Sequence, residues 1–388
     1  MLRIDRFADE RLRELEREGL LRRPDDGGRR RAAQEAAEEL GTVFVDASSN
    51  DYLGLAELDV SRETGVQGSA LGAGASRLIH GSRRPHVELE TALADWVRLP
   101  TALLSTSGYA ANVGLMGALG RPGSVIVSDR LNHASIIDGC RLSRAEVVVT
   151  PHLDLAAIDA ALKGAAAIAA RWVVVESCFS MDGDGPDLRK LRALCDDHDA
   201  GLIVDEAHAL GVFGPEGAGR CAEAGVTPDV LVGTLGKAVG SQGAFVAGSA
   251  ELRALLWNDA RSFVFSTAPS PRLSAWTLLH VERARRANDR RGTLFERALE
   301  LRTALAAHGI AVESGLGGAI IPVVIGDNQR VLAVVAELER SGILAQGIRP
   351  PTVPAGTARL RLTATATWSA DVPSRVADAI ARALQNPG

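Results

Sequence analysis

The fold prediction rests on two stretches, LIVDEAH at 202–208 and VLVGTLGK at 230–237. Each begins with a short apolar run and stops abruptly at polar or glycine residues, a pattern typical of a buried strand in a parallel sheet. In such sheets, ligands bind outside the carboxyl ends of the strands. We therefore expect Asp205, His208, Thr234 and Lys237 to converge on one crevice.

An acid, an imidazole and a lysine framed by glycines predict a site for pyridoxal phosphate (PLP). This cofactor needs a carboxylate beside its ring nitrogen and a lysine that forms a Schiff base with its aldehyde. Two simpler interpretations stand beside this one: Asp205 caps the next helix, or Lys237 is a solvated lysine in a glycine-rich loop. A nucleotide-binding phosphate loop is excluded, because Leu231 and Ala238 occupy positions where that motif needs glycine and serine or threonine.

The composition narrows the classes of protein that fit this chain. Its 388 residues are enough for two domains, and a hydrophobic content of 46% supports a sizeable core. A net charge of -5 and a pI near 6.0 argue against a dedicated nucleic-acid-binding protein. We expect no signal peptide, no membrane span and no metal site, because the sequence lacks an apolar leader, a long apolar run and a cysteine–histidine cluster. These features predict a cytoplasmic protein with reduced cysteines.

The order of the expected elements predicts the architecture. Strand-like and helix-like segments alternate between residues 102 and 247, which favours an α/β domain with a doubly wound, mostly parallel sheet. The pattern changes after residue 286 to that of a small α+β domain. We predict three parts: an N-terminal helix and linker at 1–45, a large PLP-binding domain at 46–286 and a small C-terminal domain at 287–388. We also expect an amphipathic helix at 3–21 and an alanine-rich helix at 155–170.

Other strand ends supply further candidate residues. The turn STSG at 105–108 leads into a helix, whose free N–H groups would bind the cofactor's phosphate. His133 follows the apolar run 125–127 and is either a capping histidine or an imidazole stacked on the cofactor ring. The run GAGASR at 72–77 lacks the last glycine of the dinucleotide motif, so we expect a flexible loop that lines a site. Arg359 and Arg361 share one face of a strand, either as solvated arginines or as a clamp for a substrate carboxylate.

Five motifs along the chain resemble those of the α-oxoamine synthases, which are fold-type I PLP enzymes. They are NDYLGL at 50–55, SGYAAN at 107–112, FSMDGD at 179–184, DEAH at 205–208 and GTLGK at 233–237. The resemblance runs in order over nearly the whole chain. It implies the PLP-dependent transferase fold of type I, acyltransferase activity, and a homodimer with shared active sites.

The resemblance also implies roles at the cofactor. Lys237 would hold PLP and act as the catalytic base, Asp205 would keep the ring nitrogen protonated, and His133 would stack on the ring. The phenolic oxygen of PLP would be hydrogen-bonded by His208 and Ser180. The phosphate would be surrounded by Ser107, Gly108, Tyr109 and Thr234, while Ser266 and Thr267 would reach the phosphate in the partner subunit.

For the substrates, the resemblance implies that Asn50 and Arg361 bind the carboxylate of the amino acid, with Arg359 as the alternative to Arg361. Thr352 is expected to be a further substrate-binding residue. The stretch 348–363 most resembles the branch that makes 8-amino-7-oxononanoate, in biotin biosynthesis, from L-alanine and a pimeloyl thioester of coenzyme A or of acyl carrier protein. Two departures from the family pattern concern the acyl entrance: Trp368 replaces a usual histidine, and the loop 78–84 is more charged.

Three alternatives stand beside this function. A sibling synthase would join glycine to acetyl-CoA, as glycine C-acetyltransferase does, or to succinyl-CoA, as 5-aminolevulinate synthase does. A PLP aminotransferase would share the acid and the lysine but release no CO2. A PLP-binding regulatory protein would show no turnover.

Overall fold

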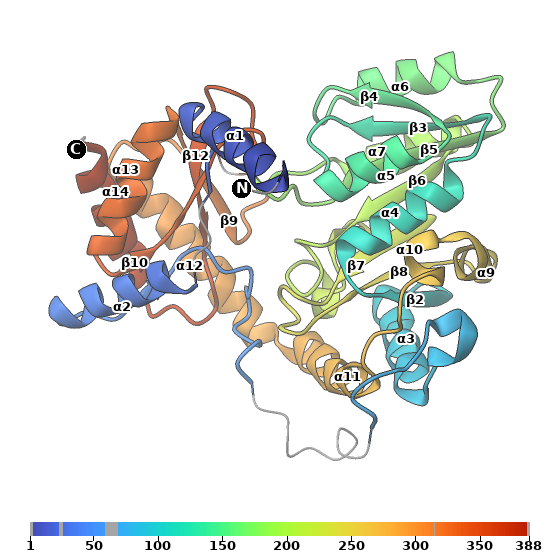
Figure 1. Ribbon diagram of the computed structural model, residues 1–388, viewed down its shortest axis with the longest axis horizontal. Coiled ribbons are helices and arrows are strands. Elements are labelled where there is room, and N and C mark those ends of the chain that lie inside the picture. The colour runs from blue at the N-terminus through green and yellow to red at the C-terminus, as the bar shows by residue number, and fades with distance from the viewer. Residues whose placement is uncertain (1–2, 23–25, 59–68, 314, 386–388) are drawn as a thin grey trace. The chain divides into compact units, whose positions relative to one another are not determined.

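The computed structural model describes residues 3–22, 26–58, 69–313 and 315–385 (Figure 1). The chain forms two compact units, one from Asn50 to Thr293 and one from the segments up to Ser49 and from Leu294 onward. This division differs from the expected three parts, because the N-terminal segment belongs to the same unit as the C-terminal residues. The second boundary lies at residue 293 rather than 286.

A seven-stranded sheet organises the larger unit (Figure 1). Its strands run in the order β2-β8-β7-β6-β5-β3-β4, and β8 is antiparallel to both neighbours, whereas the other pairs are parallel. The prediction of a mostly parallel sheet is therefore confirmed. The strands are β2 (Thr101–Ser105), β3 (Ser124–Asp129), β4 (Glu146–Thr150), β5 (Ala170–Glu176), β6 (Gly201–Asp205), β7 (Val230–Thr234) and β8 (Ala244–Gly248).

Alternate residues of the central strands pack into two apolar cores, one on each face of the sheet. Val174 and Ile203 belong to the core that includes Leu115 of α4, whereas Leu202 belongs to the core that includes Leu191 of α7. Both faces are therefore covered, as a doubly wound fold requires. The helices of this unit are α3 (Arg84–Val97), α4 (Gly108–Leu119), α5 (Ala134–Leu142), α6 (Leu155–Gly164), α7 (Leu188–Asp197), α8 (Arg220–Ala224), α9 (Ala250–Asp259), α10 (Arg261–Val264) and α11 (Pro271–Arg286), with short turns of π-helix at Arg77–Gly81 and 3-10 helix at Pro215–Gly217.

The smaller unit has the expected α+β composition. Its three-stranded antiparallel sheet has the order β11-β12-β9, and a separate parallel pair joins β1 to β10. Arg359 and Arg361 on β12 are buried, so the interpretation as two solvated arginines is wrong. The elements are α1 (Arg3–Arg17), α2 (Gly28–Glu39), β1 (Val45–Asp46), β9 (Ile320–Gly326), α13 (Asn328–Arg340), β10 (Ile343–Leu344), β11 (Gln346–Ile348), β12 (Ala358–Thr363) and α14 (Val372–Gln385), and α12 (Asn288–Ala307) begins in the larger unit.

Among the described residues, no helix is long and apolar enough to cross a bilayer. All four cysteines are buried thiols. Trp368, which departs from the family pattern, is also buried, and its indole N–H donates to the backbone oxygen of Asp46 at 3.3 Å.

Candidate active site

A cavity of about 350 Å³ lies at the carboxyl ends of β5, β6 and β7. This volume falls within the range of roughly 300–1,000 Å³ that is usual for small-molecule sites. The structure brings together most of the predicted site residues here. Those that line the cavity are Asn50, Ser107, Gly108, Tyr109, His133, Asp205, His208, Thr234 and Lys237.

Asp205 ends β6 and is only 4% exposed. Its Oδ2 accepts a hydrogen bond from Asn112 Nδ2 at 2.8 Å, and its Oδ1 accepts one from the backbone amide of Ala207 at 2.8 Å. The residues that follow form turns rather than a helix, so the interpretation of Asp205 as a helix cap is wrong. Two donors hold this carboxylate in place with its charge available to a cation in the cavity.

Glu176, a second acid at the cavity, was not assigned by the sequence analysis. It ends β5 and is the register partner of Asp205 on the neighbouring strand. Burial raises the pKa of Glu176 well above its usual value, and the charge of Asp205 raises it further, although the backbone amides of His133 and Ser180 and the charge of Lys237 act in the opposite direction. Its Oε1 is buried with no hydrogen-bond partner. Glu176 could have been found by the argument used for Asp205, because it directly follows the apolar run 173–175.

His133 is a capping residue, as one interpretation expected, and it also lines the cavity, whereas its stacking on the cofactor ring stays a prediction. It caps α5 by accepting a hydrogen bond at Nδ1 from the Ser135 amide at 3.2 Å, and Nδ1 lies 2.7 Å from Ser135 Oγ. The pKa of His133 lies below its usual value, mainly because of burial. The charge of Lys237 lowers it further, whereas the charge of Asp205 acts in the opposite direction. A neutral ring that accepts at Nδ1 carries its proton on Nε2. Asn112 donates to Ser135 Oγ at 3.0 Å and so connects this histidine to Asp205.

Lys237 reaches Thr234, with its Nζ donating to Oγ1 at 3.3 Å. The other two lysines of the chain, Lys163 and Lys190, are exposed and pair with acids on their own helix or its cap. Lys237 is therefore the lysine that can form a covalent bond to a ligand in the cavity.

His208, which also lines the cavity, is buried, and its Nδ1 lies 2.6 Å from the hydroxyl of Tyr52. The Tyr52 hydroxyl donates to Asn50 Oδ1 at 3.1 Å. Tyr52 belongs to the motif NDYLGL, from which no role for its side chain was predicted. It links a residue expected at the cofactor to one expected at the substrate.

The turn before α4 has the features of an anion site. Ser107 caps this twelve-residue helix by accepting from the Ala110 amide at 3.1 Å. A Cβ at Gly108 would lie only 2.8 Å from Thr234 Cγ2, so glycine allows the helix start to approach β7 closely. The helix dipole and the free N–H groups favour a phosphate here. Tyr109 lines the cavity as well, and its hydroxyl donates to Asp138 at 2.7 Å.

The remaining predicted residues do not line this cavity. Ser180 lies in the turn after β5, and its backbone amide faces Glu176. Thr267 forms an isolated bridge with Ser76, and Ser266 lies beside it at a separate small cavity. Thr352 and Arg361 belong to the smaller unit, where Arg361 donates to Thr363 Oγ1 at 3.2 Å. Their roles stay predictions.

Comparisons with known proteins extend over most of the chain. The model of the family "Aminotransferase class I and II" matches residues 42–380. A putative 8-amino-7-oxononanoate synthase 2 of Bacillus velezensis is 41% identical over 359 residues, which cover 92% of this chain and 91% of the relative. The 8-amino-7-oxononanoate synthase of Anaeromyxobacter dehalogenans is 45% identical over 335 residues, 85% and 84% of the two chains. A serine palmitoyltransferase variant from S. paucimobilis, solved with a bound PLP–myriocin aldimine, superposes with a TM-score of 0.83 at 28% identity and covers 88% of this chain and 87% of that one.

Proposed function

Because this chain belongs to the α-oxoamine synthase family, within the class I and II aminotransferases, we propose that it condenses L-alanine with a pimeloyl thioester. The products are 8-amino-7-oxononanoate, CO2 and the free thiol carrier, and the reaction is a step of biotin biosynthesis. Relatives of 41% and 45% identity that carry this name support the choice within the family. The observation that carries the proposal is the cavity that holds Asp205 and Lys237 together.

The residues of this cavity fit PLP. The site offers a buried carboxylate for the ring nitrogen, one amine for the aldehyde and a helix start for the phosphate. Glu176 Oε1 and Asn112 Oδ1 are buried acceptors with no hydrogen-bond partner, which is unusual unless a ligand supplies one. The serine palmitoyltransferase of similar structure binds PLP.

Lys237 would hold the cofactor covalently and Asp205 would hold its ring nitrogen protonated, in an electron-poor ring. When bound, PLP supplies an electron sink for the bond electrons released at the substrate Cα. The other residues that would hold the cofactor are His133, Ser180 and His208 at the ring and Ser107, Gly108, Tyr109 and Thr234 at the phosphate, together with Ser266 and Thr267 from the other subunit of a homodimer.

The protein's own groups perform the proton transfers and the orientation. The Lys237 amine would take the Cα proton of the amino acid as general base. His133 is neutral with its proton on Nε2, so it can donate a hydrogen bond to the thioester carbonyl and polarise it. Asn50 and Arg361 would bind the carboxylate of the amino acid, and Thr352 would be a further substrate-binding residue. We place the reaction in the cytoplasm, in keeping with four buried thiols.

Product analysis tests this proposal. The purified protein, reconstituted with PLP, is incubated with L-alanine and pimeloyl-CoA, with glycine and acetyl- or succinyl-CoA, and with an amino-group acceptor. We expect 8-amino-7-oxononanoate and equal amounts of CO2 and coenzyme A from the first mixture. Product from glycine only would favour a sibling synthase, and amino transfer without CO2 would favour an aminotransferase. A parallel assay with pimeloyl-acyl carrier protein identifies the preferred carrier.

Lys237→Ala is expected to lower turnover by at least about 100-fold, the lower end of what a general base contributes. Far-UV circular dichroism should show an intact fold, because Lys237 lines the cavity and its hydrogen bond to Thr234 is long, at 3.3 Å. Lys163→Ala is the matched control, since Lys163 lies on the surface of α6, and it should retain full activity. A Lys237→Ala enzyme with normal turnover would reject the assignment of the site.

A further inference from the structure

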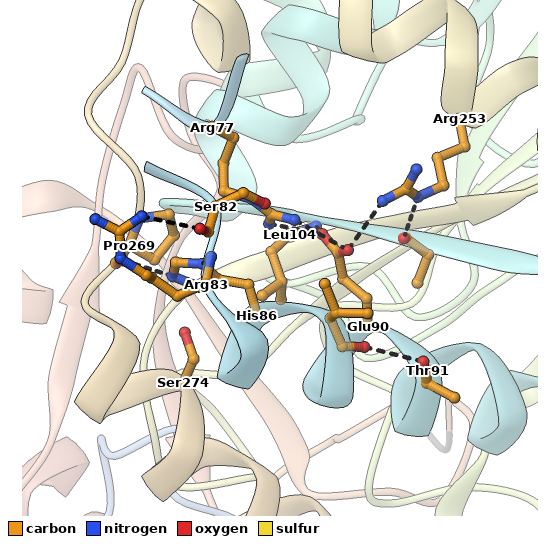
Figure 2. A network of polar contacts seen from close by, with 12 residues as sticks. Arg77, Ser82, Arg83, His86, Glu90, Thr91, Leu104, Arg253, Pro269 and Ser274 are labelled. Carbon is orange, nitrogen blue, oxygen red and sulfur yellow. Dashed lines mark hydrogen bonds and ion pairs between the residues drawn. The ribbon is translucent and has the colours of Figure 1, made fainter. Parts of the chain in front are cut away.

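A buried carboxylate, Glu90, lies at the centre of a polar network outside the cavity (Figure 2). Glu90 belongs to α3 and is 4% exposed. Arg77 donates to it through both terminal nitrogens, from Nη1 to Oε1 at 2.8 Å and from Nη2 to Oε2 at 3.2 Å. Both side chains are excluded from solvent, so the two groups form a fully buried bidentate ion pair.

Glu90 also fixes the strand that leads to the expected phosphate turn. Its Oε1 accepts the backbone amide of Leu104 at 2.9 Å, near the carboxyl end of β2. Arg253 donates from Nη2 to Glu90 Oε2 at 3.1 Å and from Nε to the carbonyl of Ala102 at 3.2 Å (Figure 2). The turn 105–107 leaves this strand end, so its position depends on the network.

Arg77 connects the same carboxylate to a second segment. The neighbouring residue Ser76 forms a bridge with Thr267, and the Ala268 amide donates to the Ala75 carbonyl at 3.0 Å. Arg77 lines a small cavity together with Ser105, Thr106, Ser266 and Thr267. Arg77 is therefore buried between the turn 105–107 and the segment 266–267. The expectation of a flexible loop at 72–77 is wrong at this residue.

The physics of buried ion pairs indicates what this network contributes. The loss of hydration on burial roughly offsets the attraction of the charges, so such a pair is a weak source of stability. Its bidentate geometry does fix the backbones that carry it. The ring of Trp257 lies 5.4 Å from both Arg77 Cζ and Arg253 Cζ and further restricts the two guanidinium groups.

We propose that the Arg77–Glu90 pair positions the phosphate site, by fixing the turn 105–107 relative to Ser266 and Thr267. This inference rests on the proposed function, because these two segments are the ones expected to face the cofactor's phosphate in the two subunits. Arg77 and Glu90 are positioning residues, and neither touches the cofactor. Their removal should weaken binding of the phosphate group and leave binding of the ring unchanged.

The test compares the affinities of the apo protein for PLP and for pyridoxal, which lacks the phosphate. The variant Arg77→Met with Glu90→Gln removes both charges but keeps an acceptor for the Leu104 amide. We expect its affinity for PLP to fall by about tenfold or more, as for the loss of hydrogen bonds to a charged group. Its affinity for pyridoxal and its midpoint of thermal unfolding should stay near those of the wild type.

A control pair lies at the amino-terminal end of the central strand β6. Asp229 Oδ2 accepts from Arg192 Nη1 at 2.6 Å and from the backbone amide of Leu202 at 2.7 Å, at the start of β6. Arg192→Met with Asp229→Asn also removes an arginine–carboxylate pair that holds a backbone amide, although this pair is more exposed than Arg77–Glu90, and it should leave the PLP affinity unchanged. A second variant, Arg77→Lys, keeps the charge and loses the planar fork. It should also weaken PLP relative to pyridoxal, and it serves as the test if the double variant does not fold.

The possible outcomes are distinct. Unchanged PLP affinity in a folded Arg77 variant would overturn the inference, and so would an equal loss of affinity for PLP and pyridoxal. A wild-type protein that binds neither compound would overturn the proposed function and the inference with it. Loss of PLP affinity alone, absent from the Arg192 control, would support the inference.

Discussion

Glu176 and Asp205 end neighbouring strands in register, so two acids meet at the floor of the cavity. Two neighbouring carboxyl groups in a buried site cannot both ionise at low cost in free energy, because their like charges repel. Asp205 receives two hydrogen-bond donors, and Glu176 accepts from the backbone amides of His133 and Ser180 but has one oxygen with no partner. Because burial and the charge of Asp205 both raise the pKa of Glu176, we infer that Glu176 is the neutral acid of the pair, which keeps a single anion opposite a protonated ring nitrogen.

Glu176→Gln tests this assignment through the stability of the apo protein. Burial and Asp205 raise the pKa of Glu176, so its contribution to stability is fully present below the unfolded-state pKa, about 4.3, and is lost as the pH rises through the folded-state pKa. Glutamine does not titrate, so the variant does not lose stability at this position as the pH rises. Its free energy of unfolding should therefore rise relative to the wild type between pH 5 and pH 8, as measured by urea unfolding.

Asp205→Asn provides the companion measurement, because it removes the neighbouring charge. In that background the advantage of Glu176→Gln at pH 8 should shrink, since one cause of the raised pKa is gone. Parallel stability curves for the wild type and Glu176→Gln from pH 5 to pH 8 would mean that Glu176 titrates normally and that the assignment of charges is wrong.

At the scale of elements, the turn after β5 is held by a histidine between two acids. His152 Nδ1 lies 2.9 Å from Asp129 Oδ1, and its Nε2 lies 3.0 Å from Asp184 Oδ2. Its ring also meets Phe179 edge-on, at 4.4 Å between centroids. This contact joins the end of β3 to the turn that carries Ser180, which is expected to bind the cofactor.

Stability should fall in alkaline solution because of this contact. Burial alone would lower the pKa of His152, but hydrogen bonds to Asp129 and Asp184 and the charges of both acids outweigh it and raise the pKa to about 9. The contribution is fully present below the unfolded-state pKa, about 6.5, and is lost as the pH rises through about 9. It amounts to at most about 3 kcal/mol, less the effect of solvent screening. The destabilisation caused by His152→Gln should shrink between pH 6.5 and pH 9.5 in urea unfolding.

His280 on α11 supplies a control of opposite sign. Burial lowers the pKa of His280, although a hydrogen bond to the Val239 carbonyl and the charge of Asp51 raise it. Its contribution is therefore present above about 6.5 and is lost as the pH falls through the folded-state pKa. His280→Gln should cost less stability as the pH falls from 6.5 to 5. Equal pH profiles for His152→Gln and the wild type would show that the histidine is not charged in the folded protein.

The sequence identified those parts of the site that follow from local pattern. Asp205 and Lys237 come after recognisable apolar runs, and Ser107 precedes a helix, so their meeting follows from the rule for parallel sheets. The register that pairs Glu176 with Asp205 has no signature in either strand alone. The burial of Arg77 depends on Glu90 and on Arg253, which lies far along the chain. The helix expected at 155–170 ends at Gly164, and Ala170 enters β5, where strand pairing overrides the high helix propensity of alanine.

At the scale of the whole molecule, the proposed function makes assembly part of the site. Ser266 and Thr267 do not line the cavity of their own chain, and Thr267 pairs with Ser76 instead. Large apolar side chains close to this bridge in the sequence are exposed, with Ile79 at 76% and Phe265 at 73%. Exposed apolar groups that cluster together mark interaction surfaces. We therefore expect this face to pack against a second copy of the chain.

Replacing both Ile79 and Phe265 by glutamate should convert dimers into monomers, because unpaired charges would be buried in the interface. PLP affinity should fall with it by about tenfold or more, because Ser266 and Thr267 would no longer reach the partner's phosphate. Sedimentation equilibrium measures the first effect and cofactor titration the second. Leu142→Glu, at a similarly exposed leucine on α5, is the control and should change neither. A double variant that stays dimeric would exclude this face from the interface. A monomer that binds PLP as tightly as the wild type would mean that each cavity holds its phosphate without the partner.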